Sequence, residues 1–374
     1  MANEGKKGGV GDRKEGFSAV LGNMKSLRWW GSFLVRNAIY IVIIFLVIYT
    51  EYDSRFVQHS SNSFLSFAAI IDIVKRVGAS LFLALGVGGI IVLTGTDLSA
   101  GRVMGLTACI CASLLQKTLE EYPPKMFPDM AAPPILIVLL IAMAFGGFVG
   151  IINGFCVAKF KLHPFIVTLA TQLMLYGAVL SYVQLGKGGG SPISGLTEEY
   201  KNVVKGTWKL PAAIDRNMTE IPYYVAYALI AAVVMWFIWN KATLGKNMYA
   251  VGANPEAANV SGVSVLWTTI FIFMIAGILY GVSGFVEAAR TGSNSPTTGV
   301  NAELDAIAAC VIGGVSFTGG VGKISGVITG VFLLQIISVS LLWLHISGNL
   351  QYVIKGLIIV AACAIDMRKY LQKK

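Results

Sequence analysis

The sequence predicts an all-α polytopic membrane protein. Hydrophobic residues make up 55% of its 374 residues and charged residues only 13%, about half the charged share of ordinary soluble domains. Continuous apolar runs long enough to span a bilayer recur along the chain; they include 33–49, 134–158, 164–182, 223–239, 267–285 and 352–365. A membrane β-barrel would instead show alternating segments of about 10 residues, so a helical bundle in a lipid bilayer is expected.

The distribution of positive charge predicts the side on which the two ends lie. The net charge is +10, and many basic residues gather near the ends: Lys6, Lys7, Arg13, Lys14, Lys25, Arg28, Arg36, Arg368, Lys369, Lys373 and Lys374. Short segments beside membrane helices carry excess Lys and Arg on the cytoplasmic side. Both termini are therefore predicted to be cytoplasmic, with an even number of crossings. This distribution argues against nucleic acid as a partner.

Ten crossings satisfy this rule. Residues 1–32 are expected to form a disordered, interfacial basic tail, and residues 33–374 a single transmembrane domain. An interfacial helix is expected over 62–76, because Asp72, Lys75 and Arg76 are unfavourable in lipid. The expected crossings are 33–50, 77–94, 103–118, 133–157, 164–184, 222–239, 267–285, 304–318, 324–345 and 350–366.

The second, third, eighth and ninth crossings are short, glycine-rich and joined by polar turns at Gly95–Arg102 and Gly319–Lys323. Broken helices are tolerated at membrane depth only where protein buries them or where they line a watery cavity. Both turns are therefore expected near a transport path.

Small residues recur at a spacing of four, which lets helix backbones approach closely in lipid. This pattern predicts close packing within the chain or, alternatively, a seam between two copies. The residues concerned are Gly146, Gly150 and Gly154, then Gly277 and Gly281, and finally Gly322, Gly326 and Gly330.

The polar loop 240–266 carries signals for a short helix between two crossings. Asn254 is a good N-cap, and Pro255 suits the first helical position, where its missing N–H has no partner in any case. Glu256 would lie at the positive end of the helix dipole, and Gly262 could end the helix in the left-handed conformation. Such a helix would be rigidly connected to the crossing that follows.

The small side chains of Ala257 and Ala258 would let another protein lie close to this helix. A helix in a loop outside the lipid has no hydrocarbon in which to bury itself, so docking of a soluble partner would explain it. An ordinary surface helix is the alternative.

Glu256-Ala257-Ala258 followed by Gly262 resembles the cytoplasmic loop pattern of permeases of ATP-binding-cassette (ABC) importers. From about residue 33 onward the chain is similar to their branched-chain subgroup, which imports ribose, galactose and related sugars. The galactose-type permeases are the most similar. The segments that carry the resemblance are 95–102, 191–195, 245–263 and 303–322.

The resemblance implies a multi-pass permease domain in the inner membrane, and two identical copies of it would form the pore. Cytoplasmic ATPase subunits would supply ATP and Mg, and an extracytoplasmic sugar-binding protein would deliver the cargo. Glu256, Ala257, Ala258 and Gly262 would make the coupling contact with the ATPase. A monosaccharide such as galactose, methyl galactoside or glucose is the implied cargo, with ribose or a nucleoside as alternatives.

Charged residues at helix junctions are further candidates. Asp97 could cap the next helix, pair with Arg102 or line a cytoplasmic gate. Glu303 and Asp305 begin the eighth crossing, where carboxylates favour the helix dipole; Asp305 is also a pore candidate, and Glu303 could contact the binding protein.

Two more sets follow from side-chain chemistry. Glu287 and Arg290 are spaced to pair and are predicted to lie outside, where they could dock the binding protein through complementary charge. Hydrogen-bonding and aromatic groups for sugar in the pore could come from Asn153, Gln172, Tyr176 and Tyr280.

The chain lacks the residues for hydrolysing ATP itself. A phosphate-binding loop needs Ser or Thr after Gly-Lys, whereas Lys246 is followed by Asn247 and Lys323 by Ile324. Neither a catalytic set nor a metal-binding pattern is evident, so neither a membrane enzyme nor a metal site is expected. An ion-coupled secondary transporter is the remaining alternative, although only Lys355 lies well inside an expected crossing.

Overall fold

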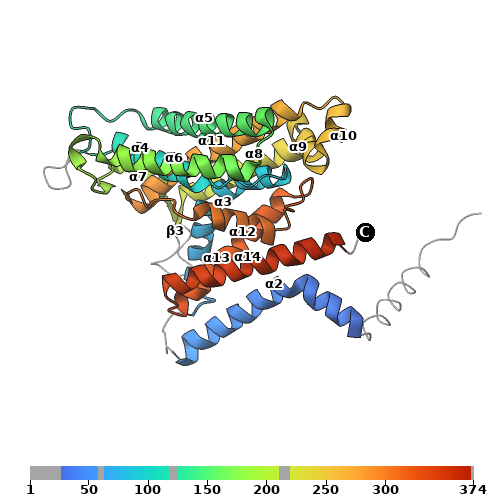
Figure 1. Ribbon diagram of the computed structural model, residues 1–374. Coiled ribbons are helices and arrows are strands. Elements are labelled where there is room, and N and C mark those ends of the chain that lie inside the picture. Colours follow the sequence, from blue (N-terminus) through green and yellow to red (C-terminus); the bar gives the residue numbers. More distant parts are fainter. Residues whose placement is uncertain (1–26, 58–62, 118–124, 210–219, 372–374) are drawn as a thin grey trace, which may run out of the picture.

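The computed structural model describes residues 27–57, 63–117, 125–209 and 220–371. Helices dominate these residues (Figure 1). They are α2 (Leu27–Tyr52), α3 (Phe67–Val92), α4 (Ala100–Leu114), α5 (Ile135–Phe160), α6 (Pro164–Gln184), α7 (Glu198–Lys205), α8 (Tyr223–Asn240), α9 (Thr243–Ala253), α10 (Pro255–Val260), α11 (Val265–Thr291), α12 (Ala302–Ile312), α13 (Ile324–Trp343) and α14 (Gly348–Leu371). The tail expected over 1–32 lies mostly outside the described residues.

Short elements occupy the connections. A π-helix, η1 (Asp53–Val57), follows α2, and a 3-10 turn, η2 (Gly186–Gly188), follows α6. Two antiparallel pairs of strands complete the described structure: β1 (Ile193–Ser194) with β4 (Ser293–Asn294), and β2 (Thr207–Lys209) with β3 (Glu220–Pro222). The β1–β4 pair holds the segment after α11 against the segment after α6.

Among the described residues, five helices are long and apolar enough to cross a membrane: α5, α6, α8, α11 and α13. Their positions agree with the fourth, fifth, sixth, seventh and ninth expected crossings. Helix α4 is apolar but shorter, with 15 residues. A mainly helical membrane fold is thus confirmed.

One expected element is wrong. The separate interfacial helix over 62–76 does not exist, because residues from Phe67 to Val92 form one continuous helix, α3. Its charges lie in its first turns, where Arg76 pairs with Asp72 four residues earlier at 2.8 Å. The eighth crossing is a half-helix: α12 has 11 residues, which gives a length of about 16 Å and is too short to span hydrocarbon.

The most extensive contact between helices joins α5 to α11. Gly146 lies against the backbone of Gly277, and Gly281 lies against the carbonyl of Ala142. Farther along, Gly150 lies against Phe273. A β-carbon at any of these glycines would collide with the facing backbone. Both stripes predicted on these helices therefore pack against each other within the chain.

The third glycine stripe is only partly helical. Gly326 and Gly330 lie on α13 and pack against the backbone of Gly313 and Ala309 at the end of α12. Gly322 lies before α13 begins, so it does not share a helix face with them.

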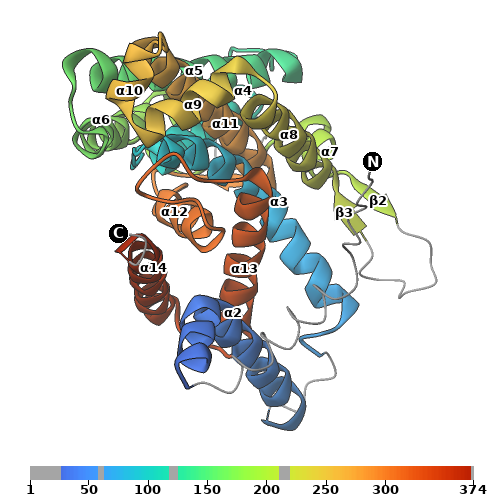
Figure 2. The ribbon, with the colours of Figure 1, turned by 90° about the vertical axis from the view of Figure 1, so that its right-hand side faces the viewer.

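Figure 1 shows α5, α6 and α11 extending in one direction, with α9 and α10 at one end and α7 at the other, while α8 packs against α3 and lies apart from α6 (Figure 2). Helices α2 and α14 lie apart from this group, and α3 and α13 reach toward α2 (Figure 2). Ile43 of α2 packs there against Ile337 and Leu341 of α13. The start of α2 and the end of α14 both lie on the side that carries α9 and α10 (Figure 1).

We predict that Gly277→Val destabilises the fold by about 1–3 kcal/mol, because the added methyl groups force α5 and α11 apart. Thermal unfolding of the purified protein in detergent, followed by size-exclusion chromatography, measures the loss. Gly177→Val on α6 is the matched control, since no atom lies within 4 Å of a β-carbon placed there. Equal melting of the two variants would contradict the packing argument.

Candidate functional site

The predicted short helix is present as α10. The side chain of Asn254 accepts hydrogen bonds from the backbone N–H groups of Glu256 and Ala257, both at 3.0 Å. Pro255 occupies the first helical position. Gly262 has a φ of +83°, in the left-handed region that favours glycine, and ends the turn after the helix. Each local signal in the sequence is therefore used as predicted.

One face of α10 is exposed and the other is anchored. Glu256 and Ala257 are exposed, and Val260 is 90% exposed although it is apolar. Ala258 is only 5% exposed and packs into the main core. The prediction that Ala258 contacts a partner directly is therefore revised: its side chain holds the helix in place, while Glu256, Ala257 and Val260 form the free face.

A tight turn fixes α10 to α11. The N–H of Val263 donates to the carbonyl of Ala258 at 3.0 Å. The hydroxyl of Ser264 then caps α11 by accepting from the N–H of Trp267 at 3.4 Å. Helix α11 has 27 residues and is about 40 Å long. A displacement of α10 is therefore carried directly into the longest helix of the bundle.

Helix α9 makes a second connection into the bundle. Gly252 of α9 lies against the carbonyl of Val92 at the end of α3, and the N–H of Gly320 donates to that same carbonyl at 2.8 Å. Gly319 lies against Thr94, and the hydroxyl of Tyr249 donates to the carbonyl of Gly322 at 2.8 Å. The end of α3 and the turn Gly319–Lys323 therefore meet beside α9.

A buried polar network holds the turn between α3 and α4. The Oδ1 atom of Asp97 accepts from the N–H of Ser99 at 2.8 Å and from its hydroxyl at 2.6 Å. The Nδ2 of Asn153, on α5, donates to the Ser99 hydroxyl at 3.1 Å, and the Thr171 hydroxyl, on α6, donates to Oδ1 of Asn153 at 2.6 Å. Asp97 thus stabilises the turn that begins α4, as a cap would.

The hydroxyl of Thr168 ties α6 to the same turn. It accepts from the N–H of Leu98 at 3.2 Å and donates to the carbonyl of Thr96 at 3.1 Å. Tyr280 of α11 is fully buried, and its hydroxyl lies beside the carboxylate of Asp97. Four helices therefore converge on one buried carboxylate.

Arg102 does not pair with Asp97. Its Nη1 donates to the carbonyl of Pro296 at 2.9 Å, and its guanidinium lies 4.4 Å from the ring centroid of Tyr176. Gln172 donates to the carboxylate of Glu303 at 3.4 Å. These four residues therefore join α4, α6 and α12, and Arg102 supports the turns that precede α12.

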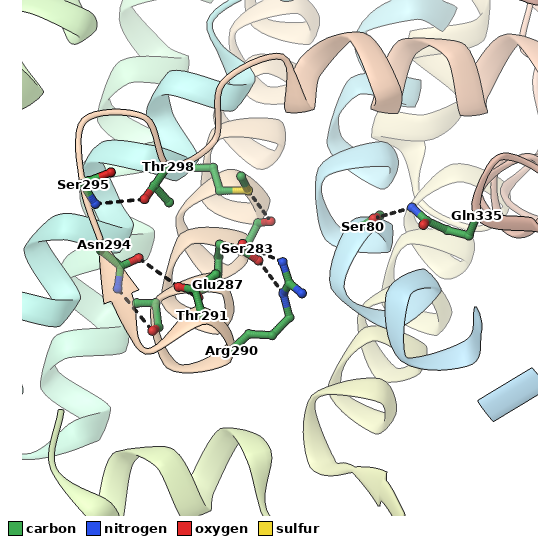
Figure 3. Close-up of polar contacts among 11 residues, drawn as sticks. Ser80, Ser283, Glu287, Arg290, Thr291, Asn294, Ser295, Thr298 and Gln335 are labelled. Carbon is green, nitrogen blue, oxygen red and sulfur yellow. Dashed lines mark hydrogen bonds and ion pairs between the residues drawn. The ribbon is translucent and has the colours of Figure 1, made fainter. Parts of the chain in front are cut away.

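Three other predicted residues line a cavity. Glu287 and Arg290 form a two-point ion pair on α11, with both nitrogen–oxygen distances at 2.7 Å (Figure 3). Asp305 on α12 accepts from Lys355 on α14 at 2.8 and 3.1 Å. All four side chains line a cavity of about 330 Å³. Docking by Glu287 and Arg290, and a pore role for Asp305, remain predictions.

Sequence reasoning missed two features of these sites. Val260 is the most exposed apolar residue of α10. The sequence signal that could have identified it is an apolar side chain three residues after Ala257, in the helix predicted to lie outside the lipid. Ser80 and Gln335, which line the cavity, come from apolar stretches of α3 and α13. They could have been found only as polar residues inside expected crossings.

The comparisons with known proteins agree with this geometry. The family model described as branched-chain amino acid transport system / permease component matches residues 69–363. The chain belongs to this permease family. Galactose/methyl galactoside import permeases are similar to it: the one from Haemophilus influenzae is 41% identical over 91% of this chain and 96% of its own length. The one from Escherichia coli is 40% identical over 92% and 97%.

A ribose import permease from Haemophilus influenzae is also similar, with 31% identity over 90% of this chain and 94% of its own length. No solved structure matches the chain significantly. Members of the family are permeases of transport systems, and the five long apolar helices of this chain agree with a membrane-spanning member of that family.

We predict that Asp97→Ala destabilises the protein by about 1–3 kcal/mol, because the N–H and hydroxyl of Ser99 lose a buried acceptor. Asp97→Asn keeps an oxygen acceptor and should cost clearly less. Thermal unfolding of both variants measures the difference. If both variants melt like the unchanged protein but transport equally poorly, the charge of Asp97 acts at a gate rather than as a cap.

Proposed function

We propose that this chain is the permease subunit of an ATP-driven importer that carries galactose or a related hexose into the cell. The carrying observation is α10, an exposed helix with a free apolar tip at Val260 that continues through a tight turn into α11. Similarity to galactose/methyl galactoside import permeases over nearly the whole chain supports the cargo.

The proposal gives the bundle an orientation. The end with α9 and α10 is cytoplasmic, and the start of α2 and the end of α14 lie on that same side (Figure 1). The basic residues of the chain ends support this orientation through the positive-inside rule. The ten crossings are then α2, α3, α4, α5, α6, α8, α11, α12, α13 and α14. Helix α12 and the turns that precede it together form one broken crossing. A bacterial inner membrane is the proposed location.

The ATPase subunits dock on the free face formed by Glu256, Ala257 and Val260. ATP and Mg are bound on those subunits, because this chain has no phosphate-binding loop. Closure of the ATPase pair moves α10 as a rigid element, and α11 carries the movement across the membrane. Helix α9 transmits it at the same time to the end of α3 and to the turn Gly319–Lys323.

A second copy of the permease and an extracytoplasmic sugar-binding protein complete the importer. The binding protein docks at the end opposite α10, where α7 lies (Figure 1). On α7, the hydrogen bond from Lys201 lowers the pKa of the exposed Glu198. Exposed charges of this kind favour docking through complementary potentials.

Ribose or a nucleoside is the alternative cargo, and the ribose import permease at 31% identity is the observation that keeps ribose open. An ion-coupled carrier is the alternative mechanism. Both are separated from the proposal by uptake in proteoliposomes that contain the permease, its ATPase and its binding protein. ATP-dependent galactose uptake that persists without proton or sodium gradients is expected. Uptake by the permease alone would overturn the proposal.

We predict that Val260→Asp reduces ATP-driven uptake at least tenfold, because a charge replaces the apolar tip on which the ATPase docks. The fold should be unaffected, since this side chain is 90% exposed. Co-purification of the ATPase with the permease measures docking, and uptake measures coupling. Lys201→Gln, at the opposite end of the bundle, is the control and should retain the ATPase. Undiminished co-purification with Val260→Asp would contradict the assignment of this face.

A further inference from the structure

The cavity of about 330 Å³ lies between α3, α4, α11, α12, α13 and α14. Its volume is at the lower end of the range for small-molecule sites, about 300–1,000 Å³. Glu287 and Arg290 come from the last two turns of α11, so the cavity opens toward the end of the bundle opposite α10. It therefore lies where a molecule entering from outside arrives first, on the orientation proposed above.

The polar groups of the lining come from separate helices. Figure 3 shows the Glu287–Arg290 pair on α11 and the bond from Nε2 of Gln335, on α13, to the hydroxyl of Ser80, on α3, at 2.9 Å. Only one N–H of the Gln335 amide is used in that bond, so its remaining donor and its oxygen stay available. Asn301 caps α12 with a φ of +62° and no side-chain bond to the helix, which leaves a second amide at the cavity wall.

The charges of the lining are already paired. Glu287 is bound at two points by Arg290, and Asp305 is bound by Lys355. The four formal charges therefore sum to zero, and each carboxylate keeps lone pairs that its basic partner does not occupy. A neutral ligand with several hydroxyl groups can bind such groups without breaking either pair.

We propose that this cavity is a binding site for a neutral polyol of monosaccharide size, built into the permease itself. The inference deepens the proposed function, on which the direction of entry rests. Hydroxyl groups of the ligand bind the amides of Gln335 and Asn301 and the free lone pairs of Asp305. The exposed ring of Tyr352, also in the lining, offers an apolar face to the C–H side of a sugar.

The same lining disfavours branched-chain amino acids, which the description of the family names. Their ammonium and carboxylate groups would have to displace Lys355 or Arg290 from an existing partner. A ligand without hydroxyl groups would also leave the amides of Gln335 and Asn301 without partners, and unpaired buried polar groups are costly. A site that hydrogen-bonds hydroxyl groups therefore discriminates strongly against a ligand without them.

Protection from chemical labelling tests the site directly. In the permease–ATPase complex in proteoliposomes, Ser80→Cys is expected to react with a charged methanethiosulfonate reagent, and millimolar galactose should slow the reaction at least fivefold. Leucine at the same concentration should have no effect. Thr329→Cys is the matched control: it lies on α13 but not in the cavity lining, and galactose should leave its labelling unchanged. The unchanged protein supplies the background from native cysteines.

Gln335→Leu tests the amide at nearly constant volume. Added to Ser80→Cys, it should raise the galactose concentration needed for half-protection at least fivefold, while Thr329→Val should not. The proposal is overturned if Ser80→Cys is not labelled, if galactose does not protect it, or if leucine protects it equally well.

The outcomes separate this inference from the proposed function. Galactose protection in a complex that fails to import galactose with ATP would support the site and refute the importer assignment. ATP-driven import of galactose without protection at Ser80→Cys would support the importer and refute the site.

Discussion

The close approach of α5 and α11 is the constraint on which the rest of the structure depends. Lipid tails are as apolar as the helices they surround, so burial of apolar surface does not drive helix association in a membrane. Packing of backbone against backbone does, and Gly146, Gly150, Gly277 and Gly281 make it possible along most of both helices. Because α11 is held over this length, it behaves as one rigid body. A short helix attached to its first residue can then act on a cavity near its last turns.

The broken parts of the bundle show how irregular backbone is kept inside a membrane fold. The turn before α4 and the segment before α12 expose backbone groups that lipid cannot satisfy. Buried side chains supply the partners: Asp97 and Thr168 bond the first segment, and Arg102 bonds the second through Pro296. The glycines of α4 let the second segment lie directly against the helix, since Gly101 and Gly105 contact the backbone of Thr298 and Gly299. These polar residues therefore stabilise the irregular backbone of the two segments.

Signals that act within a few residues could be predicted from the sequence. Local chemistry predicted the caps of α10 at Asn254 and Gly262 and the bounds of α6. It also predicted the glycine stripes, but not which helices the stripes bring together. Contacts that depend on the arrangement in three dimensions could not be predicted. Arg102 is five residues from Asp97, yet it bonds Pro296, 194 residues away. Asp72 and Arg76 suggested a separate interfacial helix, but a pair formed within one turn makes their charges compatible with a continuous α3. Lys355 was noticed as an isolated charge, and its partner on α12 became evident only in three dimensions.

Two connections run from the short helices α9 and α10 to the cavity, and they reach different walls. Helix α10 leads through α11 to Glu287 and Arg290. Helix α9 touches Gly320, and the turn that contains it leads back to α12 and so to Asp305. The Asp305–Lys355 pair then holds α14, which otherwise packs loosely against the bundle. On the proposed function, a push on α9 and α10 would move both walls at once, but through helices of unequal length and different anchorage. Unequal movement of the walls would change the width of the cavity, which is what alternating exposure of the proposed sugar ligand requires.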